Sequence, residues 1–293
     1  MKEEAITFGE MRRLVGVVTE PSEGSENPLN VAVVLLNSGI VHRVGPGRIY
    51  VKMARELAAD GFTTLRFDLS GIGDSLARHD SIPFEKSAVQ ETQDAMDFLQ
   101  MTRGIERFVL LGGCSGAYLS LETARHDLRV IGTILLNFPI GVASDGSELA
   151  DRHAFHYYYN FAISRIQSWR KFLTGRADYS KITRAIRSHL VRKFKSRQAN
   201  WPEAVQLMAD LRLVTDRGVR VAFVNSEGDP RLDDLLAAGS RDLREFCSVG
   251  KVVCDVVPKS DHTFTSIDDH SRLLRVIHER LSAMCCATAL STC

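Results

Sequence analysis

The 293-residue sequence has no long apolar run, no paired-cysteine motif and almost no net charge. No uncharged apolar stretch reaches the roughly 20 residues that a membrane-spanning helix needs, and the first residues are acidic where a signal peptide is basic. The six cysteines lack CxxC pairs and have no histidines at zinc spacing, so neither a disulfide scaffold nor a structural metal site is expected. The net charge of +1 indicates no partner. We expect a cytoplasmic enzyme or binding protein.

Short apolar runs alternate with amphipathic segments through much of the chain. Residues 30–36, 62–68, 107–113, 130–137, 219–225 and 251–257 are β-branched and apolar, as in parallel strands covered on both faces. An antiparallel pair, "AITF" and "LVGVVTE", opens the chain, and helical patterns lie between most of the later runs. Strand and helix in alternation predict an α/β fold with a mostly parallel central sheet flanked by helices.

The alternation is interrupted by a basic, aromatic-rich segment. Residues 152–200 hold twelve Lys or Arg and one acid, so this segment carries +11 and the rest of the chain −10. We predict an α/β core at 1–143 and 213–293 and an inserted helical cap, or lid, at 144–212. Its charge would suit an acidic acyl carrier protein, although a solvated helical face fits equally well. No nucleic-acid motif supports a nucleic-acid partner.

The segment "LGGCSGAYLS" places a cysteine at the centre of a glycine-rich turn between a strand and a helix. A sharp turn of this kind pushes its central side chain out at the carboxyl edge of the sheet and needs small neighbours, here Gly112 and Gly116. Cys114 then lies at a helix N-terminus, which favours a thiolate. The alternative is a buried, inert cysteine.

A nucleophilic thiol needs a base and an acid that orients the base. Asp229 follows the strand at 219–225, and His262 follows the strand at 251–257, in the chain order nucleophile, acid, base. The predicted triad is therefore Cys114, Asp229 and His262. Three further acids compete for the orienting role: Glu227, Asp233 and Asp261.

Acyl transfer also needs N–H donors for a developing oxyanion. We assign one to the N–H of Ser115 and the second to the N–H of Gly39 or Ile40, in the loop after the strand at 30–36. The candidate substrate-binding residues are His42 and Arg43 in that loop and Tyr157 and Tyr158 in the cap. The tyrosines would equally serve as the cap's own core.

"LRFDLSGIGDS" resembles the D-x-x-G-x-G-x-S segment of α/β-hydrolases, matched by Asp68, Gly71, Gly73 and Ser75. With the cysteine turn, the "GDP" loop and the "DHTF" loop, the chain is similar to the serine-aminopeptidase-like and carboxylesterase or thioesterase groups. The resemblance implies an α/β-hydrolase fold and acyl-enzyme chemistry. Cysteine replaces the usual serine, and "NSG" replaces the frequent "HG" of the oxyanion loop.

The cysteine bears on the substrate, because an acyl-cysteine is itself a thioester. We expect hydrolysis or transfer of an acyl group from a coenzyme A or carrier-protein thioester, or from an ester. One alternative is an ordinary esterase or deacylase acting on a small-molecule or saccharide ester. Another is a non-catalytic binding protein on a hydrolase scaffold. A homodimer is left open.

No metal or organic cofactor is expected. Gly71-Ile-Gly73 follows a strand, but Leu76 stands where a dinucleotide motif has its third glycine. "GGCSGA" lacks the Lys-Ser/Thr pair of a phosphate-binding loop.

Overall fold

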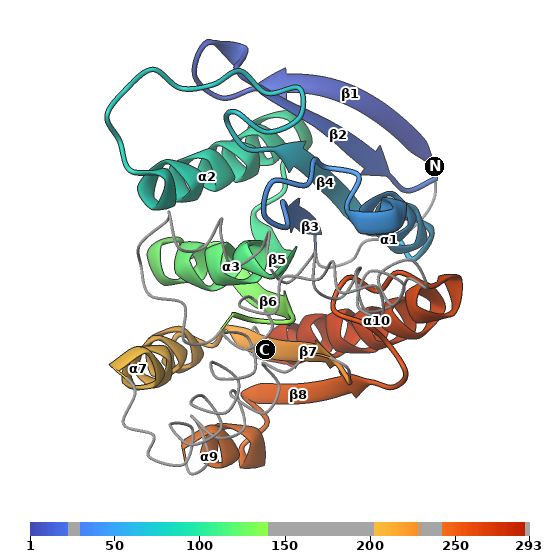
Figure 1. Ribbon diagram of the computed structural model, residues 1–293, viewed down its shortest axis with the longest axis vertical. Coiled ribbons are helices and arrows are strands. Elements are labelled where there is room, and N and C mark those ends of the chain that lie inside the picture. Colours follow the sequence, from blue (N-terminus) through green and yellow to red (C-terminus); the bar gives the residue numbers. More distant parts are fainter. Residues whose placement is uncertain (23–29, 140–201, 228, 230–241, 291–293) are drawn as a thin grey trace, which may run out of the picture.

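An eight-stranded sheet forms the centre of the computed structural model, which describes residues 1–22, 30–139, 202–227, 229 and 242–290 (Figure 1). The strands are β1 (Lys2–Phe8), β2 (Leu14–Glu20), β3 (Val31–Leu36), β4 (Thr63–Asp68), β5 (Arg107–Gly113), β6 (Val130–Leu136), β7 (Arg220–Ser226) and β8 (Val252–Val257). The helices are α1 (Ile49–Ala59), α2 (Phe84–Arg103), α3 (Ser115–His126), α7 (Pro202–Asp216), α9 (Asp242–Ser248) and α10 (Ile267–Leu290), with short 3-10 turns η1 (Glu10–Arg12) and η2 (Pro46–Arg48).

The sheet is mostly parallel. Its order is β1-β2-β4-β3-β5-β6-β7-β8; β1 pairs antiparallel with β2, and β2 antiparallel with β4. Every pair from β4 through β8 is parallel. The carboxyl ends of these strands therefore meet at one edge, and the loops that follow β3, β5, β6, β7 and β8 share that edge.

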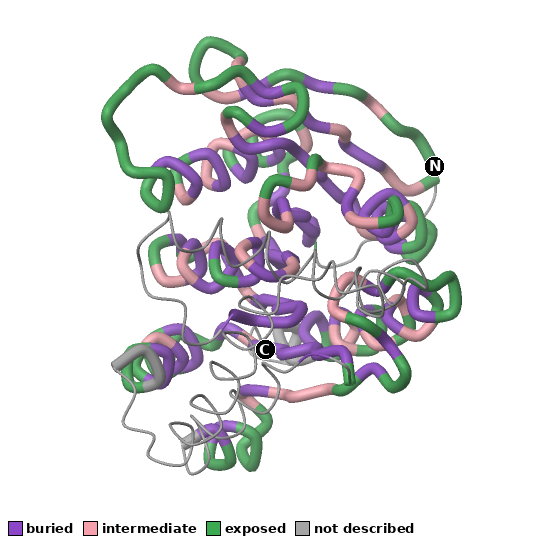
Figure 2. The backbone as a smooth tube through the Cα atoms, viewed as in Figure 1, coloured by how far each residue is buried: buried purple, intermediate pink, exposed green. Residues whose placement is uncertain are grey.

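Helices cover both faces of the sheet. Helices α1 and α10 pack on one face, and α2, α3, α7 and α9 on the other (Figure 1). Successive side chains of a strand alternate between these layers: Val33 and Leu35 belong to one apolar cluster, and Val34 and Leu36 to the other. Strands buried on both sides explain the unbroken apolar runs of the sequence (Figure 2).

The fold class and the strands agree with the sequence prediction. Helix α9 is absent from that prediction, and the helix expected around residues 232–239 lies outside the described residues. The predicted boundary between cap and core at residue 212 falls inside α7, whose Leu207, Met208 and Leu211 are buried in the core. The cap itself lies almost entirely outside the described residues and stays a prediction.

Among the described residues, no helix combines the length and the apolar character that crossing a membrane requires.

Candidate active site

Cys114 stands at the turn between β5 and α3 in a backbone conformation unusual for a residue with a side chain. Its φ is 54° and its ψ −115°. The turn is fixed from both sides: the Cys114 N–H donates to the Leu136 carbonyl (2.9 Å), and the Cys114 carbonyl accepts the Ala117 N–H (3.0 Å). A strained conformation held this firmly is the form that a nucleophile at a strand-to-helix turn takes. The residue is 3% exposed.

The two glycines that flank the turn are required by close backbone approaches. A Cβ on Gly112 would lie 2.3 Å from the carbonyl carbon of Gly116. A Cβ on Gly116 would lie 2.4 Å from the Asn37 carbonyl oxygen, in the loop after β3. The G-x-C-x-G spacing therefore lets the first turn of α3 press against both β5 and the Asn37 loop.

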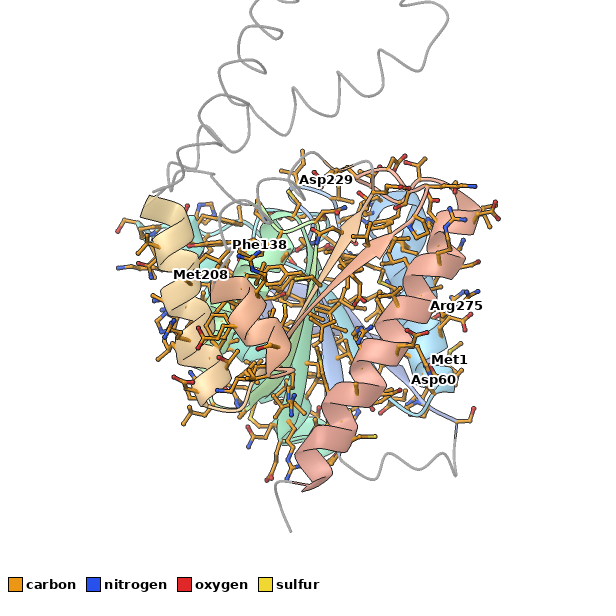
Figure 3. All side chains as sticks on the ribbon, turned by 90° about the horizontal axis from the view of Figure 1, so that it is seen from below. Met1, Asp60, Phe138, Met208, Asp229 and Arg275 are labelled. Carbon is orange, nitrogen blue, oxygen red and sulfur yellow. The ribbon has the colours of Figure 1, made fainter. Side chains whose placement is uncertain are left out.

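Residues His262 and Asp229 meet at the carboxyl edge of the sheet, from the loops after β8 and β7. The distance from His262 Nδ1 to Asp229 Oδ2 is 2.7 Å. The Asp229 side chain is 1% exposed and the His262 side chain 22%; Figure 3 shows Asp229 at this edge. Since Nδ1 faces the carboxylate, that bond fixes the orientation of the imidazole ring.

Among the competing acids, Glu227 instead accepts the Lys259 N–H (2.7 Å). Asp261 accepts the N–H groups of Thr263 and Thr265 (both 3.0 Å). Asp233 lies outside the described residues.

Asn137, at the end of β6, links the two loops that carry the pair. Its Nδ2 donates to the His262 carbonyl (2.8 Å), and its Oδ1 accepts the Ser226 N–H (2.7 Å) at the end of β7. Asn137 has a φ of 47°, in the left-handed region that asparagine tolerates better than most residues. Sequence reasoning missed this residue, although a polar residue at the end of the apolar run 130–137 was a visible signal.

Cys114 and His262 line the same small cavity, of about 30 Å³. Ser38, Tyr50 and Asn137 contribute to its wall, and Phe264 closes part of it. A volume of this size admits one or two water molecules, so the cavity has room for a small group. Neither Ser38 nor Tyr50 was singled out from the sequence.

The loop after β3 lies directly against the turn. The Gly39 N–H donates to Ser115 Oγ (2.8 Å), so this N–H stands beside the residue that follows Cys114. The N–H of Ser115 itself belongs to the first turn of α3, where helix N–H groups have no acceptor within the helix. Ile40, the other candidate for this donor, is 91% exposed.

The two other candidates in this loop do not line the cavity. The Arg43 guanidinium bonds Asp68 through Nη1 and Asp74 through Nη2, and the Arg43 N–H also donates to Asp68 (2.5 Å). His42 is exposed. A role for either residue in binding substrate stays a prediction, and Tyr157 and Tyr158 lie outside the described residues.

The buried carboxylate of Asp68 explains the D-x-x-G-x-G-x-S segment. Besides Arg43, it accepts the Asp74 N–H (3.2 Å), and a Cβ on Gly73 would lie 2.3 Å from one of its oxygens. The Ser75 hydroxyl donates to the Asp68 carbonyl (2.6 Å). The motif thus builds the scaffold of the loop after β3 and supplies no reacting group.

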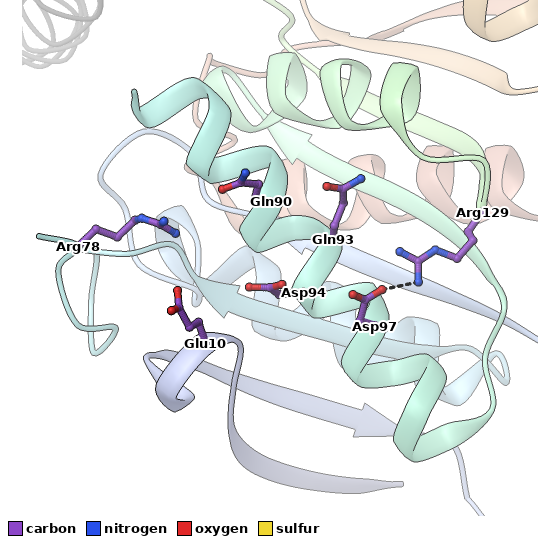
Figure 4. A pocket seen from close by; sticks show the side chains of 7 residues that line it. All are labelled: Glu10, Arg78, Gln90, Gln93, Asp94, Asp97 and Arg129. Atoms are coloured by element: carbon purple, nitrogen blue, oxygen red, sulfur yellow. Dashed lines mark hydrogen bonds and ion pairs between the residues drawn. The ribbon is translucent and has the colours of Figure 1, made fainter. Parts of the chain in front are cut away.

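A larger hollow of about 440 Å³ lies elsewhere, along the outer side of α2 (Figure 4). Its walls carry charges of both signs, as in the ion pair between Asp97 and Arg129 (2.6 Å). No predicted site residue reaches it, and it contains no nucleophile. In the described part of the chain, no group of three or more His, Cys, Asp or Glu side chains is arranged to hold a metal ion.

Comparisons with known proteins agree with this architecture. An alpha/beta serine hydrolase without lid from Xanthomonas campestris superposes with a TM-score of 0.54 at 16% identity, covering 95% of this chain and 94% of the other. A proline iminopeptidase from Mycobacterium smegmatis gives 0.55 at 18% identity, covering 98% and 100%. An alpha/beta hydrolase from a Penicillium species gives 0.57 at 15%, covering 97% and 98%.

A search of curated proteins found no match. The sequence profile of the alpha/beta hydrolase family, however, matches residues 33–276, which include the cysteine turn and the loops of Asp229 and His262. The chain belongs to the alpha/beta hydrolase family.

Proposed function

We propose that this protein passes an acyl group through Cys114, with His262 as the base and Asp229 as the residue that orients it. The observation that carries the proposal is the 2.7 Å bond from His262 to the buried Asp229, with His262 and Cys114 lining one cavity. A carboxylate on Nδ1 fixes the ring orientation and tautomer, so Nε2 can take a proton. The N–H groups of Ser115 and Gly39 are the proposed oxyanion donors.

Each step follows from these roles. His262 takes the thiol proton, and the Cys114 sulfur attacks the carbonyl carbon while the carbonyl electron pair moves to oxygen. The leaving group departs with the proton from His262, which leaves an acyl-cysteine thioester. Water, or another nucleophile, then loses its proton to His262 and attacks the thioester carbonyl. The carbon–sulfur bond breaks, the acyl group leaves on that nucleophile, and the sulfur takes the proton back from His262, which restores the thiol. The Gly39 N–H donates to Ser115 Oγ in the structure, so it must release that hydroxyl before it can donate to the oxyanion.

Sulfur as the nucleophile supports a thioester donor. Exchange of one thioester for another is nearly balanced in energy, so loading from coenzyme A or a carrier protein needs little driving force. The acyl-cysteine stays reactive toward water, amines, alcohols or thiols, and both hydrolysis and transfer therefore belong to the proposal. We keep the prediction that an acidic acyl carrier protein docks on the basic residues 152–200.

Serine is the usual nucleophile in the hydrolases that this chain resembles, and this favours a second candidate function. An ordinary esterase or deacylase would use the same residues on a small-molecule or saccharide ester. A third candidate is a non-catalytic binding protein, for which we expect Cys114 to react slowly with alkylating reagents.

The proposal is tested by comparing an ester with its matched thioester on four proteins: wild type, Cys114→Ala, Cys114→Ser and Cys247→Ala. Cys247 is exposed on α9 and serves as the matched control. The alanine variant at 114 should lose turnover, and Cys247→Ala should keep it. Preference for the thioester in the wild type supports the proposal, whereas preference for the ester supports the esterase. Full activity of Cys114→Ala contradicts both.

A further inference from the structure

Tyr50 is a buried side chain held in one orientation beside Cys114. It lies in the first turn of α1, where its N–H donates to the Val44 carbonyl (3.1 Å), and it is 2% exposed. Its hydroxyl oxygen accepts the Gly113 N–H at 3.0 Å, one residue before the cysteine. The ring packs closely on Gly45, where a Cβ would lie 2.8 Å from Cγ of Tyr50. Both the ring and the hydroxyl are therefore fixed.

A phenol that accepts one N–H still has its own proton to donate. Tyr50 lines the 30 Å³ cavity together with Cys114 and Ser38, so the residues that carry the phenol, the thiol and a second hydroxyl share one space. A Cβ placed on Gly113 would lie 3.5 Å from the Tyr50 oxygen and 3.2 Å from Ser38 Oγ, so both hydroxyls border the residue next to the sulfur.

The electrostatic surroundings of Tyr50 keep its hydroxyl protonated, as a hydrogen-bond donor must be. Burial raises the pKa of Tyr50, the Gly113 N–H lowers it, and negative charge on Cys114 raises it again. The net shift is upward, so the phenol stays protonated at any working pH. Tyr50 can then donate a hydrogen bond but cannot act as a base.

We propose that the Tyr50 hydroxyl donates a hydrogen bond to the charged sulfur of Cys114 and so stabilises the thiolate. This role rests on the proposed function, in which that thiolate is the nucleophile. A sulfur that is 3% exposed has little water to stabilise its charge, which gives a protein donor its value. No proton leaves Tyr50: the hydrogen bond is strong while sulfur is charged and weakens when the acyl–sulfur bond forms.

The test measures the pH dependence of Cys114 alkylation by iodoacetamide, with the modified peptide quantified by mass spectrometry. Only the thiolate reacts, so the rate against pH gives the apparent pKa of the thiol. Tyr50→Phe should raise that pKa and slow alkylation at pH 7 by about tenfold, the effect of losing one hydrogen bond to a charged group. Tyr118→Phe, on the half-exposed α3 tyrosine, is the matched control and should change nothing.

A merely structural role gives a different pattern. Loss of the acceptor for Gly113 N–H lowers the melting temperature of Tyr50→Phe, but it does not move the thiol titration. An unchanged titration in a folded variant therefore overturns the proposal. The proposal is also overturned if Ser38→Ala raises the pKa of the Cys114 thiol and Tyr50→Phe does not, because the hydrogen bond to the sulfur then comes from Ser38.

A second measurement covers failure of Tyr50→Phe to fold. Wild-type protein carrying 3-fluorotyrosine has a more acidic phenol, which is a stronger donor, and the Cys114 titration should move to lower pH. No movement contradicts the proposal. These readouts need no substrate, so they separate the two claims: a Tyr50 effect together with a fully active Cys114→Ala variant refutes the proposed function and not the contact.

Discussion

The side-chain amide of Asn137 donates a hydrogen bond to the backbone carbonyl of His262, across 125 positions of sequence. The same amide accepts the N–H of Ser226, where β7 ends three residues before Asp229. One residue at the end of β6 thus sets the relative positions of the two loops whose side chains meet in the His262–Asp229 bond. The position of the imidazole depends on a residue that the sequence analysis did not identify.

Asn137→Ala should lower both stability and turnover. The Ser226 N–H loses its buried acceptor, which costs about 1–3 kcal/mol in the free energy of unfolding. The His262 loop loses its anchor, and we expect kcat to fall about tenfold or more with a misplaced base. Denaturant unfolding and steady-state kinetics measure the two effects.

Asn225→Ala is the matched control for Asn137→Ala. Asn225 is equally buried, but its Nδ2 has no hydrogen-bond partner among the described residues, and it does not line the cavity. It should keep wild-type kcat. Wild-type turnover by Asn137→Ala would show that the anchor has no part in positioning His262.

Asp229→Asn should reduce kcat by roughly two to four orders of magnitude, as expected when the residue that sets the tautomer of a catalytic histidine loses its charge. Glu227→Gln is the control, since Glu227 holds the Lys259 N–H and does not contact the histidine ring. Steady-state kinetics with the preferred acyl donor give kcat for both variants. Equal losses in both variants would mean that Asp229 is not the orienting acid.

Gly116→Ala should destabilise the protein by about 1–3 kcal/mol, the usual cost of overpacking. The added methyl group meets the Asn37 carbonyl at 2.4 Å, and both partners are backbone that cannot rotate away. Gly104→Ala is an informative comparison, because its φ is +66° but nothing lies within 4 Å of the new Cβ. Thermal unfolding should show a larger loss for Gly116→Ala and a parallel loss of activity. A loss no larger than that of Gly104→Ala would contradict the close approach.

His270 should make the protein less stable as pH falls. Burial lowers the pKa of His270, and the positive charge of Lys52, whose Nζ lies 2.8 Å from His270 Nδ1, lowers it further. Between this lowered pKa and the unfolded value of about 6.5, the unfolded chain binds more protons, so stability rises with pH in that window. The stabilisation is complete above about pH 6.5 and is lost as pH falls through the folded pKa.

His270→Gln should flatten the dependence of the free energy of unfolding on pH below 6.5. His79→Gln, on an exposed histidine in the loop before α2, should keep the wild-type slope. Urea unfolding at several pH values tests this, and the same slope in His270→Gln would exclude His270 as its source.

Local patterns in the sequence were sufficient for the sheet and for the position of Cys114. Residues 107–113 and 130–137 are largely apolar on both faces, as is typical of a parallel strand covered by helices on both sides. The G-x-C-x-G spacing marks the turn, because its glycines leave room for close backbone approaches. Asp229 and His262 followed from chain order, because loops after parallel strands share one edge.

Contacts between segments that are distant in the sequence could not be predicted from such local patterns. The Tyr50 hydroxyl meets Gly113 across 63 positions, and Ser115 Oγ meets Gly39 across 76. No periodicity of the sequence predicts these pairs, because they depend on how α1 and the loop after β3 pack against the turn between β5 and α3. The choice between Gly39 and Ile40 stayed open for the same reason, and Arg43 could not be seen to face Asp68 until β3 and β4 were paired.

Acyl transfer through Cys114 is tested by intact-protein mass spectrometry after brief incubation with a panel of acyl thioesters and esters at neutral pH. We expect a mass increase equal to one acyl group, mapped to the peptide that contains Cys114. It should be absent in Cys114→Ala and should accumulate in His262→Ala only slowly. An acyl group on another residue, or rapid turnover in the Cys114→Ala variant, would contradict the central claim that this sulfur carries the acyl group.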